Sequence, residues 1–209
     1  MTLGFTVLVI IDNLTEPMWK WPPEVQEARE TTDPYLLRGW RADPTSPDLA
    51  FLAAAPDACL MGSEIPDVSR LRDIAPIQDQ RGPYGAAFLW VDGTVSAACM
   101  LLRDADGTFR VRFTRGLHPA PSGLTSGQFD MVQAGPPIVA TGAADVGAAT
   151  VEVTSRRFGL TIHATVRDGR FVAWWPQPDS FVTYRELDAA GVPLPTVVPI
   201  EVIASDQTD

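Results

Sequence analysis

Only a few residues in this 209-residue chain are of the types that most often hold metals. The chain has two cysteines, Cys59 and Cys99, and two histidines, His118 and His163. Neither cysteine belongs to a CxxC pair and the histidines are remote from each other, whereas zinc ligands normally recur at short spacings. The sequence therefore disfavours a metal site, and we expect no cofactor.

Catalysis by a nucleophile needs a base and an acid beside it, and the sequence offers no clear set of three. Ser122 and Ser126 follow His118, but neither lies in a G-x-S-x-G motif, and SGLTSG has the composition of a flexible loop. His163, within LTIHATV, is predicted to face solvent from a strand. The 26 acidic residues single out no catalytic pair, so we keep a hydrolase with acidic catalytic residues only as an alternative function.

Two acidic motifs have structural interpretations. Asp104–Gly107 (DADG) resembles a fragment of a calcium loop, but the next residues supply no further ligands, so we predict a hairpin turn. Asp79 and Arg81, two residues apart in DQRG, share a face of an extended strand, and we predict a local ion pair that anchors the following hairpin.

Cys59 and Cys99 leave two alternatives open. One disulfide between them would stabilise the fold by about 4 kcal/mol, because it restricts the unfolded chain, and it would require an oxidising compartment. Alternatively, they are two separate buried thiols that pack as small apolar side chains.

The charge balance disfavours nucleic acid as a partner. The net charge is −10, and Lys20 is the only lysine among 16 basic residues. Nucleic-acid binders neutralise phosphates with clustered Lys and Arg. The densest cluster here is Arg110, Arg112 and Arg115, and strand alternation predicts one solvated face for Arg110 and Arg112.

We expect no membrane span, because no charge-free run exceeds 14 residues. The apolar run Thr6–Ile11 is short and has no basic flank, so it does not read as a signal peptide.

Four tryptophans are candidate interaction residues. Trp19 and Trp21 flank Lys20 in a proline-bounded segment and could form a docking patch or a cover over the β domain. Trp174 and Trp175 are adjacent, so they must point to opposite faces of a strand. Packing in the core is favoured for this pair, with an exposed indole that contacts a partner as the alternative.

The elements that position these residues are mostly short strands with Gly and Asp turns. Asp92-Gly93 predicts a two-residue hairpin loop between strands Ala86–Val91 and Thr94–Leu102. The predicted strands are Gly4–Ile11, Ala86–Val91, Thr94–Leu102, Thr108–Thr114, Pro137–Thr141, Ala148–Ser155, Leu160–Arg167, Arg170–Trp175, Phe181–Leu187 and Thr196–Ile203. Short helices are predicted at Glu24–Glu30, at Asp48–Ala55 with Pro56 ending it, and at Pro66–Asp73.

This pattern predicts a mainly β protein with minor α structure in its N-terminal third. We expect an antiparallel meander followed by an Ig-like β-sandwich. The predicted domains are an irregular N-terminal segment plus meander over residues 1–136 and the sandwich over 137–209.

Residues 57–192 resemble an uncharacterised group of actinobacterial extracytoplasmic β-rich proteins. The resemblance rests on Cys59-Leu60-Met61, on Asp79–Gly82 (DQRG), and on the FVAWWP stretch of Phe171–Pro176. It implies a mainly β fold, an extracytoplasmic location and the Cys59–Cys99 disulfide. It implies no activity, and we expect no membrane anchor like the group's within this sequence.

We therefore expect a non-catalytic, extracytoplasmic binding or interaction module. Its partner would be another protein or a cell-surface component. A structural subunit of a larger assembly, such as a phage particle, is the other alternative beside the hydrolase.

Overall fold

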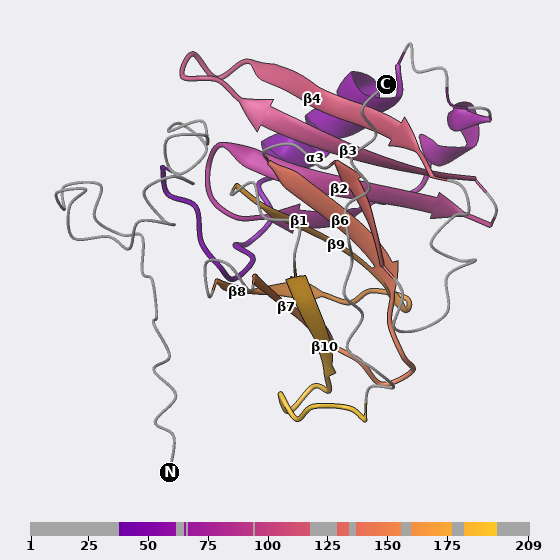
Figure 1. Cartoon of the computed structure of the whole chain (residues 1–209). Coiled ribbons are helices and arrows are strands. Elements are labelled where there is room, and N and C mark those ends of the chain that lie inside the picture. Colours follow the sequence, from indigo (N-terminus) through magenta and orange to yellow (C-terminus); the bar gives the residue numbers. More distant parts are fainter. Residues whose placement is uncertain are drawn as a thin grey trace, which may run out of the picture.

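The fold was obtained as a computed structural model and consists mainly of antiparallel β-sheet (Figure 1). The structure describes residues 38–61, 65, 67–93, 95–117, 129–133, 137–155, 160–176 and 182–195. The strands predicted at Gly4–Ile11 and Thr196–Ile203, the helix predicted at Glu24–Glu30, and His118, Ser122, Ser126, Trp19 and Trp21 lie outside these residues.

The described strands form three sheets. The first has the order β1 (Ile77–Gln80), β2 (Gly85–Asp92), β3 (Val95–Arg103) and β4 (Phe109–Gly116). The second has the order β5 (Phe129–Gln133), β6 (Ile138–Ala143) and β9 (Arg170–Trp175). The third has the order β10 (Val182–Leu187), β7 (Thr150–Ser155) and β8 (Thr161–Thr165). Every pair of neighbours is antiparallel, which confirms the predicted class.

The predicted meander is present, but its first loop is displaced by one residue from the predicted Asp92-Gly93, because Asp92 belongs to β2 and pairs with Val95. Gly93 and Gly107 both adopt positive φ, at 57° and 87°. The N–H of Gly107 donates to the carbonyl of Asp104 at 2.9 Å, so DADG is a hairpin turn as predicted.

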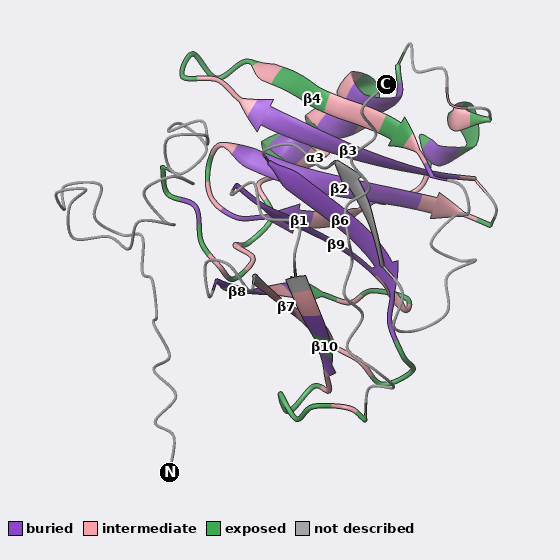
Figure 2. Ribbon diagram, in the orientation of Figure 1, coloured by how far each residue is buried: buried purple, intermediate pink, exposed green. Residues whose placement is uncertain are grey.

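The central strands β2 and β3 of the first sheet are buried on both faces, whereas β4 is largely exposed (Figure 2). Phe88 and Trp90 of β2 pack against the helical segment that carries Phe51 and Leu60. Leu89, on the opposite face, belongs to a cluster shared with the other two sheets. Because both faces of these strands are covered, the sequences of β2 and β3 are nearly continuous apolar runs and do not alternate between apolar and polar residues.

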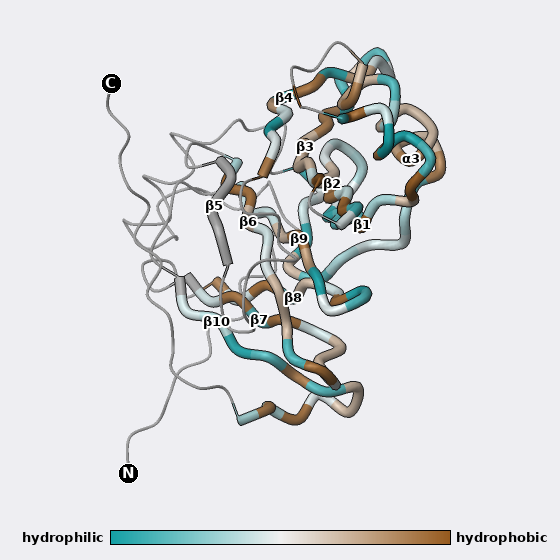
Figure 3. Tube along the Cα trace, turned by 90° about the vertical axis from the view of Figure 1, so that its right-hand side faces the viewer, coloured by the Kyte–Doolittle hydropathy of each residue, from teal (hydrophilic) through white to brown (hydrophobic). Residues whose placement is uncertain are grey.

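The predicted alternation of Arg110 and Arg112 along β4 is interrupted by a β-bulge. The partner of Leu101 is Val111 and the partner of Met100 is Phe113, so Arg112 is the extra residue of the bulge. An extra residue shifts the side-chain phase, and Arg112 therefore does not alternate strictly with Arg110. The apolar and charged residues along β4 can be followed in Figure 3.

Helix α3 (Leu49–Ala55) begins as predicted, with Asp48 accepting from the N–H of Ala50. The α-helix ends at Ala55 with Pro56 as its C-cap, as predicted, but a π-helical turn (η2, Pro56–Leu60) follows it directly. Pro56 keeps helical dihedrals, with φ −60° and ψ −43°. Pro56 occupies the first turn of η2, where the missing N–H of proline costs no hydrogen bond within that turn. The third predicted helix is a 3-10 turn, η3 (Val68–Leu71).

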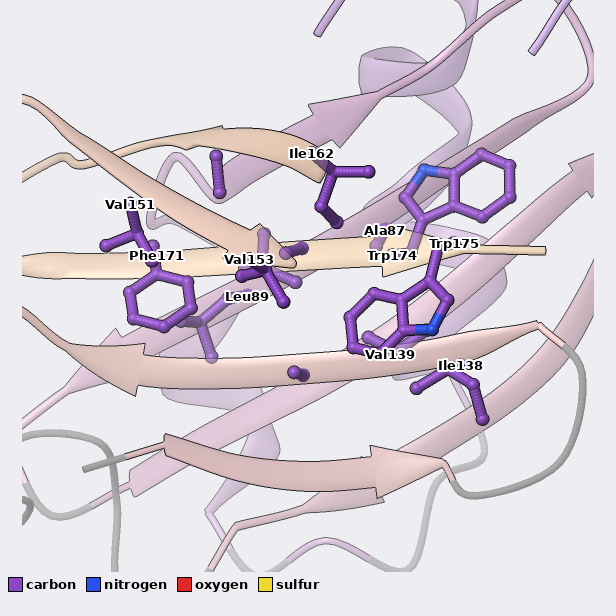
Figure 4. Close-up of a cluster of buried hydrophobic side chains, with 14 of the residues drawn as sticks. Ala87, Leu89, Ile138, Val139, Val151, Val153, Ile162, Phe171, Trp174 and Trp175 are labelled. Atoms are coloured by element: carbon purple, nitrogen blue, oxygen red, sulfur yellow. The ribbon is translucent and has the colours of Figure 1, made fainter. Parts of the chain in front are cut away.

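The main core crosses the predicted domain boundary at 136/137. Ala87 and Met100 lie in the same buried cluster as Ile138, Phe171 and Trp175. Figure 4 shows part of this cluster, with side chains from several strands meeting on β9. The division into two domains stays a prediction, but both parts share one core.

Candidate functional site

Cys59 and Cys99 form a disulfide, in agreement with the pairing that the resemblance implied. The π-helical turn η2 presents Cys59, and the middle of β3 presents Cys99. Both cysteines are at most 1% exposed. The bond therefore fastens the helical segment to the first sheet and has a structural role.

Trp174 and Trp175 are both core residues, each 1% exposed. Their indoles lie on opposite sides of β9, as adjacent strand residues must (Figure 4). The packing interpretation is therefore confirmed, and neither side chain forms a surface for a partner.

Asp79 and Arg81 form the predicted ion pair, with Arg81 Nε 2.7 Å from Asp79 Oδ2. Their side chains are 2% and 0% exposed. The Arg81 guanidinium also donates to the carbonyls of His163, at 2.6 Å, and Ala42. Oδ2 of Asp79 accepts the N–H of Trp174 at 3.0 Å, so this pair ties together β1, β8, β9 and the segment before α3.

Burial raises the pKa of the Asp79 carboxyl, and the attraction of Arg81 and the N–H of Trp174 only partly oppose that effect. A strongly shifted carboxyl in an open cleft would suggest a functional site. Asp79 is closed off from solvent, so its role is to hold the fold together.

A row of four polar side chains, three of them acidic or basic residues joined through His163, crosses the third sheet and the segment before α3. Arg185 on β10 lies opposite Glu152 on β7, and Glu152 lies opposite His163 on β8. Arg185 is 2.5 Å from Glu152 Oε1, and His163 Nε2 is 3.4 Å from Glu152 Oε2. Asp43, from the segment before α3, completes the row at 2.6 Å from His163 Nδ1.

Threonines border this row on the same side of the sheet. Thr154 and Thr161 lie opposite each other, with their hydroxyls 3.0 Å apart, and Thr165 lies opposite Thr150. The intervening residues Val151, Val153, Ile162 and Ala164 face the core. We name the side formed by Thr150, Glu152, Thr154, Thr161, His163, Thr165 and Arg185 the polar face.

His163 lies between two carboxylates on the polar face. Both ring nitrogens of His163 face carboxylates, so neither is placed to take a proton from a hydroxyl. Among the described residues, no group of three His, Cys, Asp or Glu side chains could hold a metal ion. The face can offer alternating charges and hydroxyls to a polar surface.

Two exposed loops lie beside the third sheet, one before β7 that contains Val146 and one after β10 that contains Val192. Glu186 is buried, and its carboxylate accepts the N–H of Asp145 at 2.9 Å and the hydroxyl of Tyr184 at 3.1 Å. Burial and the nearby Glu186 carboxylate raise the pKa of Tyr184. These contacts hold the turn whose Val146 is fully exposed, while Val192 in the neighbouring loop is 55% exposed.

Sequence reasoning placed His163 correctly on an outward-facing strand position, with a 36% exposed side chain. It missed Asp43, Glu152 and Arg185. Asp43 could not be found from local sequence, because it lies 120 residues from His163 along the chain. Cross-strand alternation could have suggested Glu152 and Arg185 only if the strand register had been known.

No helix within the described ranges is long and apolar enough to cross a membrane. Comparisons with protein-family models, with curated proteins and with solved structures gave no match to this chain.

Proposed function

We propose that this protein is a non-catalytic, extracytoplasmic binding module that recognises another protein or a cell-surface component through the polar face. The observation that carries the proposal is the row of Arg185, Glu152, His163 and Asp43 across four chain segments. Strand pairing holds Arg185, Glu152 and His163 in order, and Asp43 reaches His163 from the segment before α3. The four side chains are 52%, 17%, 36% and 75% exposed in that order.

A row of this kind favours recognition over raw affinity. Alternating charges at an interface select a partner with the complementary sequence of charges and disfavour others. The surrounding threonine hydroxyls can both donate and accept hydrogen bonds. Because the strands already fix the backbone, little ordering would be needed on binding.

The disulfide supports the proposed location. Such bonds form and persist in oxidising compartments and are rare in the cytosol of most organisms. Cys59–Cys99 is consistent with an extracytoplasmic protein, and with the resemblance to the actinobacterial extracytoplasmic group.

The strand order supports the Ig-like assignment, which remains part of the proposal. Strands β5, β6 and β9 pair in one sheet, and β8, β7 and β10 pair in the other. The exchange of successive strands between two sheets is typical of Ig-like sandwiches, which commonly serve as recognition modules.

Site-specific photo-crosslinking in cells that produce the protein tests the proposal. A benzophenone amino acid in place of Thr165 would lie on the polar face, and the same group in place of Asp106 would lie in the exposed turn before β4. We expect a discrete adduct from position 165 that disappears when Arg185→Glu and Asp43→Arg are added. No adduct at 165, or the same adduct from both positions, would overturn the proposal.

A further inference from the structure

The row of charges across the third sheet follows an alternating order. From one side to the other it consists of Arg185 on β10, Glu152 on β7, His163 on β8 and then Asp43. The N–H of His163 donates to the carbonyl of Ala42 at 3.2 Å, so the segment that carries Asp43 lies against β8 as a further strand would. The order is therefore cation, anion, imidazole, anion.

His163 takes the place of a second cation in this order. Its ring nitrogens lie 2.6 Å from Asp43 Oδ1 and 3.4 Å from Glu152 Oε2. A neutral imidazole has one N–H donor and a protonated imidazole has two, so His163 can donate to a carboxylate in either state. The row therefore alternates between groups that donate and groups that accept.

An alternating row of four is complementary to its own reverse. When two copies face each other about a two-fold axis that lies between them, parallel to the strands, each row meets the other in reversed order. Arg185 then lies opposite Asp43 of the second copy, and Glu152 lies opposite its His163. No like charges of the row meet in this arrangement, whereas an axis parallel to the row would place each residue opposite itself.

The threonines of the polar face follow the same symmetry. Thr150 pairs with Thr165, and Thr154 pairs with Thr161, across β7 and β8. Because the axis lies between these two strands, Thr150 would face Thr165 of the second copy, and Thr154 would face its Thr161. Hydroxyls both donate and accept, so each facing pair can form a hydrogen bond. One two-fold axis therefore matches the charges and the hydroxyls together.

We propose that the polar face, together with Asp43, binds a second copy of this chain about a two-fold axis parallel to β7 and β8. This inference rests on the proposed function and names the partner of the same face. A second copy is favoured over a different protein because it already carries the reversed order of charges that the row requires. The face is polar and each chain has a net charge of −10, so we expect a weak dimer that forms at high protein concentration.

Charge reversal in the purified full chain tests the pairing. Arg185→Glu alone and Asp43→Arg alone each place like charges opposite one another, twice in the symmetric dimer. We expect the dissociation constant from analytical ultracentrifugation to rise at least about tenfold for each variant. Both changes in one chain restore opposite charges between two identical copies, so the double variant should dimerise again.

The matched control for these variants is Arg110→Glu on β4 of the first sheet. The Arg110 side chain is 53% exposed, close to the 52% of Arg185, but it lies outside the polar face. This control should dimerise as the native chain does, because it changes the net charge by the same amount without changing the row.

The mass of the photo-crosslinked adduct from position 165 separates this proposal from the proposed function. The adduct should have the mass of two chains. In cells that also make the native chain, the double variant meets native copies with like charges at both ends of the row, so its adduct is still lost.

A native chain that stays monomeric at about 1 mM, or a double variant no more dimeric than the single variants, would overturn the second copy as the partner. Equal weakening by Arg110→Glu would do the same, since net charge and not the row would then set the association. An adduct with a different protein would also overturn it but would leave the binding module in place. No adduct of any kind would overturn both proposals.

Discussion

The buried ion pair of Asp79 and Arg81 shows how much one charged residue can organise in this fold. Arg81 is at most 1% exposed and reaches three chain segments through its guanidinium. A buried charge is costly unless it is paired and fully hydrogen-bonded. The arrangement therefore makes each partner depend on the other.

Replacing Arg81 should test this dependence. Arg81→Met leaves the Asp79 carboxyl and two carbonyls buried without their donor, and we expect a loss of about 3–5 kcal/mol in the free energy of unfolding. Urea denaturation would measure it. Arg72→Met, which breaks the exposed contact with Asp57 at 3.2 Å, is the control and should cost less than about 1 kcal/mol. Equal losses would show that burial of Arg81 has no special cost.

Asp48 makes a pH-dependent contribution at the start of α3. The N–H of Ala50 and then the Arg103 side chain lower the pKa of its carboxyl below 3.8. A lowered pKa in the folded state means that the stabilisation is present above 3.8 and is lost as the pH falls through the lower folded value.

Asp48→Asn keeps a capping acceptor but removes the charge. We expect the variant to be less stable than the native protein at pH 7 by up to about 1 kcal/mol, since the pair with Arg103 is partly solvated. The difference should shrink as the pH falls below 3.8, measured by thermal unfolding across pH. A difference that stays constant to pH 2 would contradict the assignment.

At the scale of elements, the helical segment and the first sheet act as one unit. The ring of Phe51 packs edge-on against that of Phe109, with the ring centroids 4.9 Å apart. The disulfide joins η2 to β3. The wide π-helical turn places Cys59 over the centre of the sheet. The helical layer is therefore held by packing and by a covalent bond.

Removing the disulfide should weaken this unit. Cys59→Ala with Cys99→Ala should lower the free energy of unfolding by about 4 kcal/mol, because the unfolded chain loses a crosslink that closes a 40-residue separation. Reversible denaturation with and without a reductant would measure it. The native protein should respond to the reductant and the variant should not; a native protein insensitive to reductant would contradict the expectation.

At the scale of the whole molecule, one core joins all three sheets. Leu89 and Met100 of the first sheet share a buried cluster with Val139 of the second and Val153 of the third. Parts that share a core generally unfold together. We therefore expect one cooperative transition rather than two.

Thermal unfolding followed by far-UV circular dichroism and by tryptophan fluorescence checks this expectation. The two probes should give coincident curves, and the calorimetric enthalpy should equal the van't Hoff enthalpy. Two separated transitions would instead favour independent domains on either side of residue 136.

The sequence by itself determined the local features. Turn residues at Asp92-Gly93 and Asp104–Gly107 and the apolar pattern of β2, β3 and β9 predicted the strands and hairpins. It missed β1 and β5, because IQDQ and FDMVQ are too short to show a clear apolar or alternating pattern, and it did not predict the π-helical turn after Pro56.

Only the tertiary structure decided which residues meet. The burial of Asp79 and Arg81, the joining of Asp43 to His163 across 120 residues, and the covering of both faces of the first sheet depend on which strands pair and in what register. Local propensity reaches only a few residues along the chain, whereas these contacts are set by the burial of apolar surface between distant segments.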